Sequence, residues 1–175
     1  PTLTLTPDWT GPLPPKAKPR VTARAGVDLN PLDPVADRLR LLAYLWADQP
    51  DRIARTRAAL DLAARIRPQV DRGDAAAWLE TRLASRRTGA LHLVTHTIAW
   101  QYFPKATRSR ALAALDRAGA AATATAPLAR LGMEADGNTP GAALTLTLWP
   151  GPTVIPLGRA DFHGRWVAWA APTPG

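Results

Sequence analysis

Residues 90–119, ALHLVTHTIAWQYFPKATRSRALAALDRAG, decide the fold class of this 175-residue chain. Residues 90–97 are a mixed apolar run between a glycine and a group of aromatic residues, which is typical of a buried strand. Pro104 then opens a helix that Gly119 ends. A buried strand that leads into a helix is the repeating unit of an open α/β sheet.

The same alternation extends toward the N-terminus. Asp33 suits the cap of a helix and Pro34 its first turn. Trp46 and Trp78 lie on apolar helix stripes, so we expect both in the core. The expected elements are a strand over 21–29, helices over 34–46 and 51–66, a strand over 69–71 and a helix over 75–86.

Both ends of the chain are expected to be extended. Residues 2–6 alternate Thr and Leu, which predicts a short strand, and residues 9–19 are a Pro-rich connector. We therefore divide the chain into a strand and connector over 1–19 and a single α/β domain over 20–175. Further strands are expected over 123–134, 143–149, 153–157 and 165–170, of which 143–149 is the clearest.

The order of these elements predicts an open α/β sheet. We expect a mostly parallel sheet wound by right-handed crossovers. No helix separates the last strands, so we expect them to close the sheet in antiparallel fashion at one edge.

The composition limits the classes of function and partner. The chain carries 22 Lys and Arg against 14 Asp and Glu, a net charge of +8, but Arg outnumbers Lys 19 to 3. That bias is typical of a GC-rich coding sequence, and the basic residues do not interleave with aromatic ones. A nucleic-acid partner is therefore the weakest of the alternatives, and it would bind through the helical residues Arg52, Arg55, Arg65, Arg82 and Arg86. No stretch approaches the ~20 apolar residues of a membrane span, so we expect no membrane partner.

Several catalytic motifs are missing from the sequence. The absence of Cys excludes a thiol nucleophile and a thiolate metal site, and it fits a reducing cytoplasm, where we place the protein. Serine occurs only at Ser85 and Ser109, with no Gly-x-Ser-x-Gly elbow. There is no Gly-x-x-x-x-Gly-Lys and no Gly-x-Gly-x-x-Gly loop. Three histidines would make a metal site only with a carboxylate ligand as well, so we expect no metal.

Ligands of open α/β sheets bind outside the carboxyl ends of the strands, and this rule selects the acidic candidates. Asp28 and Asn30 follow one predicted strand, and Gly73 and Asp74 follow the next. A carboxylate there is suited to a ribose diol. Each acid also has a structural alternative, since Asp28 suits a turn and Asp74 suits a helix cap.

The third predicted strand ends in imidazole and aromatic groups. His96, Trp100, Gln101 and Tyr102 follow one another there. Trp100 and Gln101 are candidates for the substrate side, and His96 and Tyr102 are candidate catalytic residues. His163 lies in a predicted hairpin turn and is a third catalytic candidate, with a structural role as its alternative.

The sequence resembles a bacterial family of uncharacterised proteins, domain of unknown function 2332, over nearly its whole length. The most specific piece is GVDLNPLDP at residues 26–34, with further matches at 72–74, 96–102 and 163–166. Family members are similar in layout to class I methyltransferases that use S-adenosylmethionine. The resemblance therefore implies a three-layer, Rossmann-like α/β fold with a mostly parallel sheet and antiparallel closing strands, which lacks the glycine-loop strand. The resemblance implies that Asp28 is the ribose-binding acid, Asp74 the adenine-side acid, and residues 96–102 the substrate-side loop.

The family's glycine loop, which resembles the one that receives the methionine end of that cofactor, is missing from this sequence. In that layout the strand before the loop lies between the strands that end at Asp28 and Thr97. Without it these strands must pair differently, expose their edges or borrow a strand. We expect the 175 residues to be the C-terminal portion of a longer protein that is inactive as a fragment.

Two functions from different classes fit these features. The first is an S-adenosylmethionine-dependent, methyltransferase-like protein that acts on an unknown small molecule. The second is a non-catalytic interaction module that keeps the fold and binds a protein, or a second copy of itself, through exposed sheet edges.

Overall fold

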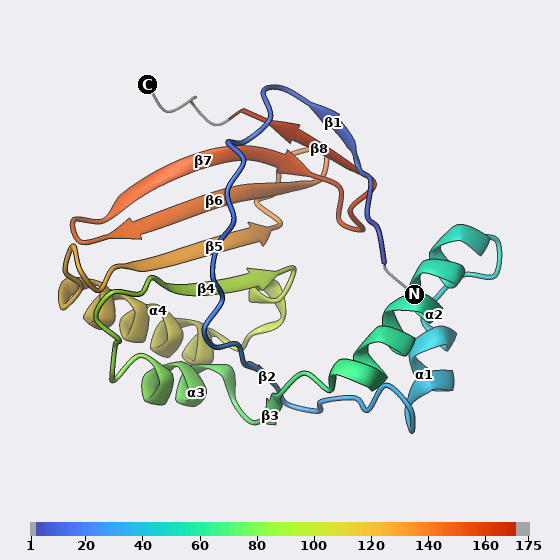
Figure 1. The fold of residues 1–175 in the computed structure, drawn as a ribbon, viewed down its shortest axis with the longest axis horizontal. Helices are drawn as coiled ribbons and strands as arrows, with labels where there is room; N and C mark the ends of the chain where they lie inside the picture. The colour runs from blue at the N-terminus through green and yellow to red at the C-terminus, as the bar shows by residue number, and fades with distance from the viewer. Residues whose placement is uncertain (1–2, 171–175) are drawn as a thin grey trace. The chain divides into compact units, whose positions relative to one another are not determined.

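The computed structural model describes residues 3–170, which divide into two compact units (Figure 1). The first unit comprises residues 19–74 with the described residues before Thr6. The second comprises residues 6–18 and those from Ala75 onward. Each unit has a sheet of its own.

The first unit is built from two short parallel strands and two helices. These elements are β2 (Gly26–Asp28), α1 (Arg38–Ala43), α2 (Pro50–Ile66) and β3 (Val70–Arg72). Parallel strands need a crossover connection, and α1 and α2 lie in it. The pairing sets Asp28 beside Arg72 at the carboxyl ends of both strands. The predicted strand over 21–29 is present but shortened to Gly26–Asp28.

The helix predicted over 34–46 is much shorter in the structure, and the prediction for Trp46 was wrong. The Asp33 carboxylate accepts the backbone N–H groups of Val35 and Ala36, each at 2.8 Å. These bonds stabilise a turn, and the regular helix α1 begins only at Arg38. Because α1 ends at Ala43, Trp46 lies beyond the apolar stripe and is 75 % exposed.

The second unit holds a six-stranded mixed sheet in the order β1-β8-β7-β6-β5-β4. Its strands are β1 (Asp8–Thr10), β4 (His92–Thr97), β5 (Leu128–Glu134), β6 (Ala142–Trp149), β7 (Thr153–Ala160) and β8 (Trp166–Trp169). The edge strands β4 and β1 pair in parallel with β5 and β8. The strands from β5 to β8 pair in antiparallel fashion, as expected for the closing strands. The mixed α/β class is confirmed, whereas the Rossmann-like, three-layer arrangement stays a prediction.

The N-terminal strand forms later in the sequence than its alternating pattern predicts. Residues 3–6 are not a strand, and Thr2 lies outside the described residues. Strand β1 instead occupies the start of the Pro-rich connector and pairs with β8, with Asp8 opposite Trp166. The rings of Trp9 and Trp169 are in contact, with centroids 5.6 Å apart. Because these two residues are separated by almost the whole length of the chain, no local sequence pattern predicts their contact.

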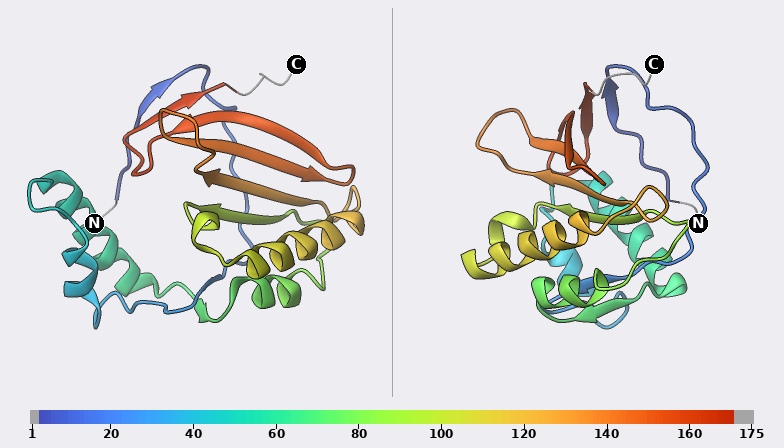
Figure 2. Two further views of the ribbon diagram at one scale, coloured as in Figure 1. Left: turned by 180° about the vertical axis from the view of Figure 1, so that it is seen from behind. Right: turned by 90° about the vertical axis from the view of Figure 1, so that its left-hand side faces the viewer.

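The core of the second unit lies where α3 (Ala75–Arg82) and α4 (Lys105–Ala120) meet the sheet. Both helices lie side by side at the β4 end of the sheet (Figure 2). Trp78 packs against this core, as predicted. The buried side chains that make up the core are those of Ala76, Leu79, Leu83, Ala111, Ala114, Leu115, Ala118, Ala122, Leu128 and Trp149.

Strands β2 and β4 each have one open edge among residues 3–170. β2 pairs only with β3, and β4 lies at the end of the six-stranded sheet with β5 as its neighbour. The sequence left three outcomes open for strands that lack the glycine-loop strand between them: different pairing, exposed edges or a borrowed strand. The structure has exposed edges.

Candidate functional site

The ends of β2 and β3 bring three predicted binding residues together. The backbone N–H of Asn30 donates to Asp28 Oδ1 at 2.7 Å, and the N–H of Gly73 donates to the Asp28 carbonyl at 3.0 Å. Arg72 Nη1 donates to Asn30 Oδ1 at 3.0 Å and to the Leu29 carbonyl at 3.2 Å. The sequence did not single out Arg72, although it precedes Gly73 directly.

Asp28 is an exposed carboxylate with capacity left for a ligand. Its Oδ1 accepts the Asn30 amide in a turn, which is the structural alternative that the sequence left open. Its Oδ2 accepts no hydrogen bond from any described residue. Asp74 follows Gly73 and directly precedes α3, where a cap and a ligand role both remain open.

A cavity of about 550 Å³ in the second unit gathers the candidates from the loop after β4. We call it the first cavity. Gln101, Tyr102 and His163 all line it, although His163 comes from the turn between β7 and β8. The other lining residues are Thr97, Ile98, Ala135 and Phe162.

The backbone at the mouth of this cavity is strained. Ile98 has φ 48°, in the left-handed region that a β-branched residue rarely adopts. Its N–H donates to the Met133 carbonyl at 2.8 Å, which holds it in place. Strain of this kind is often found at functional sites, and here it turns the chain sharply after β4.

His96 lies beside this loop in a polar cluster. Its Nδ1 is 2.6 Å from Glu134 Oε1 on β5. Arg130 Nε donates to its Nε2 at 2.9 Å. Glu134 also accepts the backbone N–H groups of Ala99 and Trp100, at 3.1 and 3.2 Å. Glu134 and Arg130 were not predicted, because they meet His96 only through the register of β4 and β5.

These contacts fix the charge and tautomer of His96. A ring nitrogen that accepts from Arg130 carries no proton, so the remaining proton is on Nδ1 and is donated to Glu134. Burial lowers the pKa of His96 from 6.5, with Glu134 acting in the opposite direction. A neutral imidazole with both nitrogens occupied is suited to positioning the loop and not to taking a proton.

Trp100 lies against His96 and not in the lining of the first cavity. The His96 and Trp100 rings stack with centroids 4.9 Å apart, and the Arg130 guanidinium lies 4.7 Å from the centre of the Trp100 ring. Trp100 also packs against the hydrophobic core. Its position connects the core to the polar cluster, whereas Gln101 and Tyr102 extend into the cavity.

A second, smaller cavity of about 220 Å³ adjoins this cluster. We call it the second cavity. It lies over β5 and β6, and it shares Ala135 with the first. Its lining residues are His96, Arg130, Gly132, Glu134, Ala135, Asp136, Ala143, Thr145 and Thr147.

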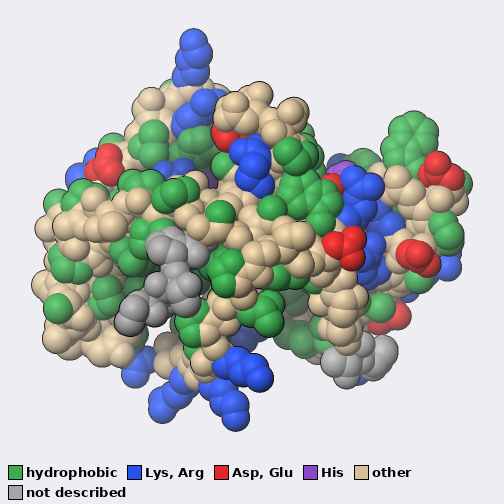
Figure 3. Space-filling model, turned by 90° about the horizontal axis from the view of Figure 1, so that it is seen from above, with side chains coloured by type: hydrophobic (Ala, Val, Ile, Leu, Met, Phe, Trp, Pro, Cys, Tyr) green, Lys and Arg blue, Asp and Glu red, His purple; other side chains and the backbone are tan. Residues whose placement is uncertain are grey.

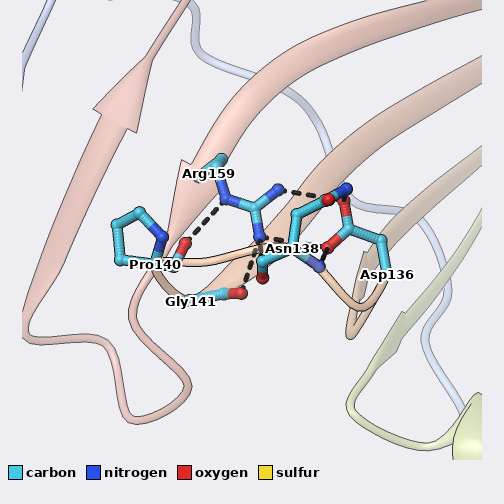
Figure 4. A network of polar contacts seen from close by, with 5 residues as sticks. All are labelled: Asp136, Asn138, Pro140, Gly141 and Arg159. Atoms are coloured by element: carbon cyan, nitrogen blue, oxygen red, sulfur yellow. Dashed lines mark hydrogen bonds and ion pairs between the residues drawn. The ribbon is translucent and has the colours of Figure 1, made fainter.

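Arg159 holds the loop between β5 and β6 that borders both cavities (Figure 4). Its Nη1 and Nη2 donate to the two carboxylate oxygens of Asp136 at 2.9 and 3.0 Å. The same guanidinium donates to the carbonyls of Pro140, Asn138 and Gly141. These bonds hold the pKa of Asp136 well below its usual range. A planar, five-donor group suits this set of acceptors.

Asp161 holds the turn that carries His163. It is buried, with 5 % exposure, and its Oδ1 accepts the backbone N–H of His163 at 3.0 Å. Arg165 donates to both of its carboxylate oxygens, at 3.2 and 2.9 Å. The Arg165 hydrogen bonds lower the pKa of Asp161 to about 2. The imidazole that lines the first cavity is therefore attached to a rigid turn.

Three further features of the described residues concern metal ligands, surface charge and membrane helices. Residues 3–170 contain no group of three or more His, Asp or Glu side chains that could hold a metal ion. Lys and Arg side chains lie in separate groups on the face seen in Figure 3, with Asp and Glu near several of them. Within the described chain, no helix combines the length and apolarity that a membrane crossing requires.

The sequence matches one protein family, described as "Uncharacterized protein conserved in bacteria (DUF2332)", over residues 1–169. The chain belongs to this family. The resemblance seen in the sequence is thereby confirmed, and DUF2332 is a bacterial family. No curated protein and no solved structure is detectably similar to the chain. The description of DUF2332 names no activity, so a functional proposal has to rest on the geometry of the site.

Proposed function

We propose that this DUF2332 protein is methyltransferase-like and that the ends of β2 and β3 bind the adenosyl part of S-adenosylmethionine. The observation that carries the proposal is the Asp28 carboxylate, exposed at the end of β2 with Oδ2 open to a donor. A ribose diol supplies two hydroxyl donors. Ligands of open α/β sheets bind at this end of the strands.

The residues fit one part of the cofactor better than the other. Asp28 and Asn30 offer acceptors to the ribose, and Gly73 leaves space beside them because it has no side chain. The 175 residues contain no Gly-x-Gly-x-x-Gly loop for the methionine end. The bound cofactor would supply an electrophilic methyl group, and the chain's own residues suggest no step beyond binding its adenosyl part.

The first cavity, which lies within the second unit, is a separate proposed site for a small molecule. Tyr102 supplies a hydroxyl, Gln101 an amide and His163 an imidazole. Tyr102 is a better catalytic candidate than His96, because both ring nitrogens of His96 already have partners. Such a mixture of aromatic and polar groups suits a small molecule with an apolar body and a few polar atoms.

Calorimetry on the protein as encoded by its gene tests the cofactor proposal. S-adenosylmethionine should bind, and Asp28→Asn should weaken binding by about tenfold or more, because a hydrogen bond to a charged acceptor is lost. Asp61→Asn is the matched control, since Asp61 is an exposed acid of the same unit on α2. No binding heat at millimolar ligand would remove the proposal.

A second candidate function, an interaction module, is favoured by the open edge of β4. Leu91 and Leu93 are 54 % and 48 % exposed at this edge. β4 contains no Pro and no Lys, the residues that usually protect edge strands. A partly apolar strand with one open edge is suited to pairing with a second copy of the chain or with another protein.

Light scattering tests this second candidate. The wild-type protein should form a dimer, and Leu93→Lys should convert it to a monomer. Leu39→Lys is the control, because Leu39 is 82 % exposed but lies on the helix α1 and not on a strand edge. A monomeric wild-type protein, or equal loss of the dimer in both variants, would reject pairing through β4.

A further inference from the structure

Arg130 presents unused donors to the second cavity. Its Nε–H is taken by His96, and the face of its guanidinium lies on Trp100. Its two terminal nitrogens hydrogen-bond to no described residue. A guanidinium donates its hydrogen bonds in its own plane. The packing of Trp100 on one face therefore leaves the edge with the two terminal nitrogens available to a ligand.

The acids that line the cavity do not neutralise Arg130 by direct pairing. Glu134 accepts three hydrogen bonds from His96 and two backbone amides. Asp136 is engaged by Arg159 and Asn138. Among the described residues Arg130 has no ion pair, although it is only partly exposed. A half-buried cation without a direct ion pair is costly. The carboxylates of Glu134 and Asp116 attract Arg130 from nearby, and an anion in contact with its terminal nitrogens would offset more of that cost.

Two hydroxyl groups complete the lining next to Arg130. Thr147 lies opposite Arg130 in the pairing of β5 and β6, and Thr145 lies opposite Gly132. Side chains at such positions share one face of the sheet, and both threonines line the second cavity. In the part of the chain that the structure describes, neither hydroxyl has a hydrogen-bond partner.

We propose that the second cavity binds the carboxylate group of a small organic acid, with Arg130 as its anchor. The two terminal nitrogens of a guanidinium match the two oxygens of a carboxylate. Thr145 and Thr147 donate to the same group. A doubly charged phosphate is disfavoured, because Glu134 and Asp136 line the same cavity. At roughly 30 Å³ per water, the volume of about 220 Å³ corresponds to about seven waters. This site lies within the second unit and is independent of the cofactor proposal.

Nuclear magnetic resonance titration of the 175-residue chain with acetate and propionate tests this site. Both acids should shift the side-chain Nε–H of Arg130 and the indole N–H of Trp100, with millimolar affinity because so small a ligand offers few contacts. Arg130→Lys should weaken binding by about tenfold or more, since an ammonium cannot donate in a fork. Thr147→Val should weaken it by a few fold.

Two matched variants serve as controls. Arg82 lies over the Trp78 ring at 5.0 Å but lines neither cavity, so Arg82→Lys should leave the titration unchanged. Thr95 points to the exposed face of β4, so Thr95→Val should also leave it unchanged. Circular dichroism verifies that each variant is folded.

Three results would overturn the proposal. The first is the absence of localised shifts at about 50 mM acetate, well above a ~1 mM dissociation constant. The second is phosphate binding as tightly as acetate at equal ionic strength. The third is retention of wild-type affinity by folded Thr147→Val and Arg130→Lys proteins.

Discussion

Replacing Glu134 by Gln removes one oxygen from the acceptor on which the polar cluster depends. In the wild type, Oε1 accepts from His96 and Ala99 and Oε2 accepts from Trp100. With the amide nitrogen at the Oε2 position, a donor faces the Trp100 N–H. An unsatisfied buried donor costs about 1–3 kcal/mol. Because the Glu134 side chain is 18 % exposed and water reaches it, we take the lower half of that range, about 1.5 kcal/mol.

Urea unfolding followed by circular dichroism measures this loss as a lower midpoint at unchanged slope. Glu80→Gln is the control. Glu80 accepts from Arg110, and these side chains are 33 % and 51 % exposed, so solvent screens the pair, which is worth at most about 1 kcal/mol. If both variants lose the same stability, Glu134 is not the acceptor that organises this region. A second readout is hydrogen exchange at residues 99–102, which should accelerate only in Glu134→Gln.

Three further predictions follow from other contacts. Burial lowers the pKa of His96 in the folded chain below its ordinary value of 6.5, so the unfolded chain takes up a proton at a higher pH than the folded chain does. The free energy of unfolding should therefore fall as the pH decreases from about 7 toward the lowered pKa. His96→Asn should flatten this slope in unfolding experiments at a series of pH values. Asp161 has a pKa of about 2 in the folded chain, against an ordinary value of 3.8. Its ionised form therefore contributes stability that is fully present above pH 3.8 and is lost as the pH falls through 2. The stability of Asp161→Asn should lack this dependence on pH in acid unfolding. A Cβ on Gly119 would collide with the Trp149 indole, so Gly119→Ala should lower stability by about 1–3 kcal/mol, and Trp149→Leu should recover part of it in a double-mutant cycle.

Local patterns were sufficient for most of the elements in the middle of the chain. The periodicity of residues 51–66 predicts α2 almost to the residue, and the run at 90–97 predicts β4. The Leu and Thr alternation at 143–149 predicts β6. Each of these segments has a clear hydrophobic pattern and is bounded by Pro or Gly, so its secondary structure depends little on distant residues.

Contacts between distant segments were beyond these patterns. Strand β1 depends on pairing with β8, more than 150 residues away, and nothing in its own sequence specifies that partner. Glu134 reaches His96 only because β4 and β5 pair with His96 opposite Gly132. A shift of one residue would place Glu134 on the other face of the sheet. The candidate loop was therefore predicted, whereas the carboxylate that holds it was not.

Strand β5 explains how the core and the polar cluster come to share one face of the sheet. Leu128, Arg130, Gly132 and Glu134 alternate along it, from the buried core to the second cavity. Gly132 is the necessary member of this series, because a Cβ there would lie 2.9 Å from His96 Cε1. Without that side chain the imidazole can lie across the strand and reach both Arg130 and Glu134. The polar groups are thus positioned by paired strands, which are more rigid than loops, and a ligand in the second cavity would meet donors that are already in place.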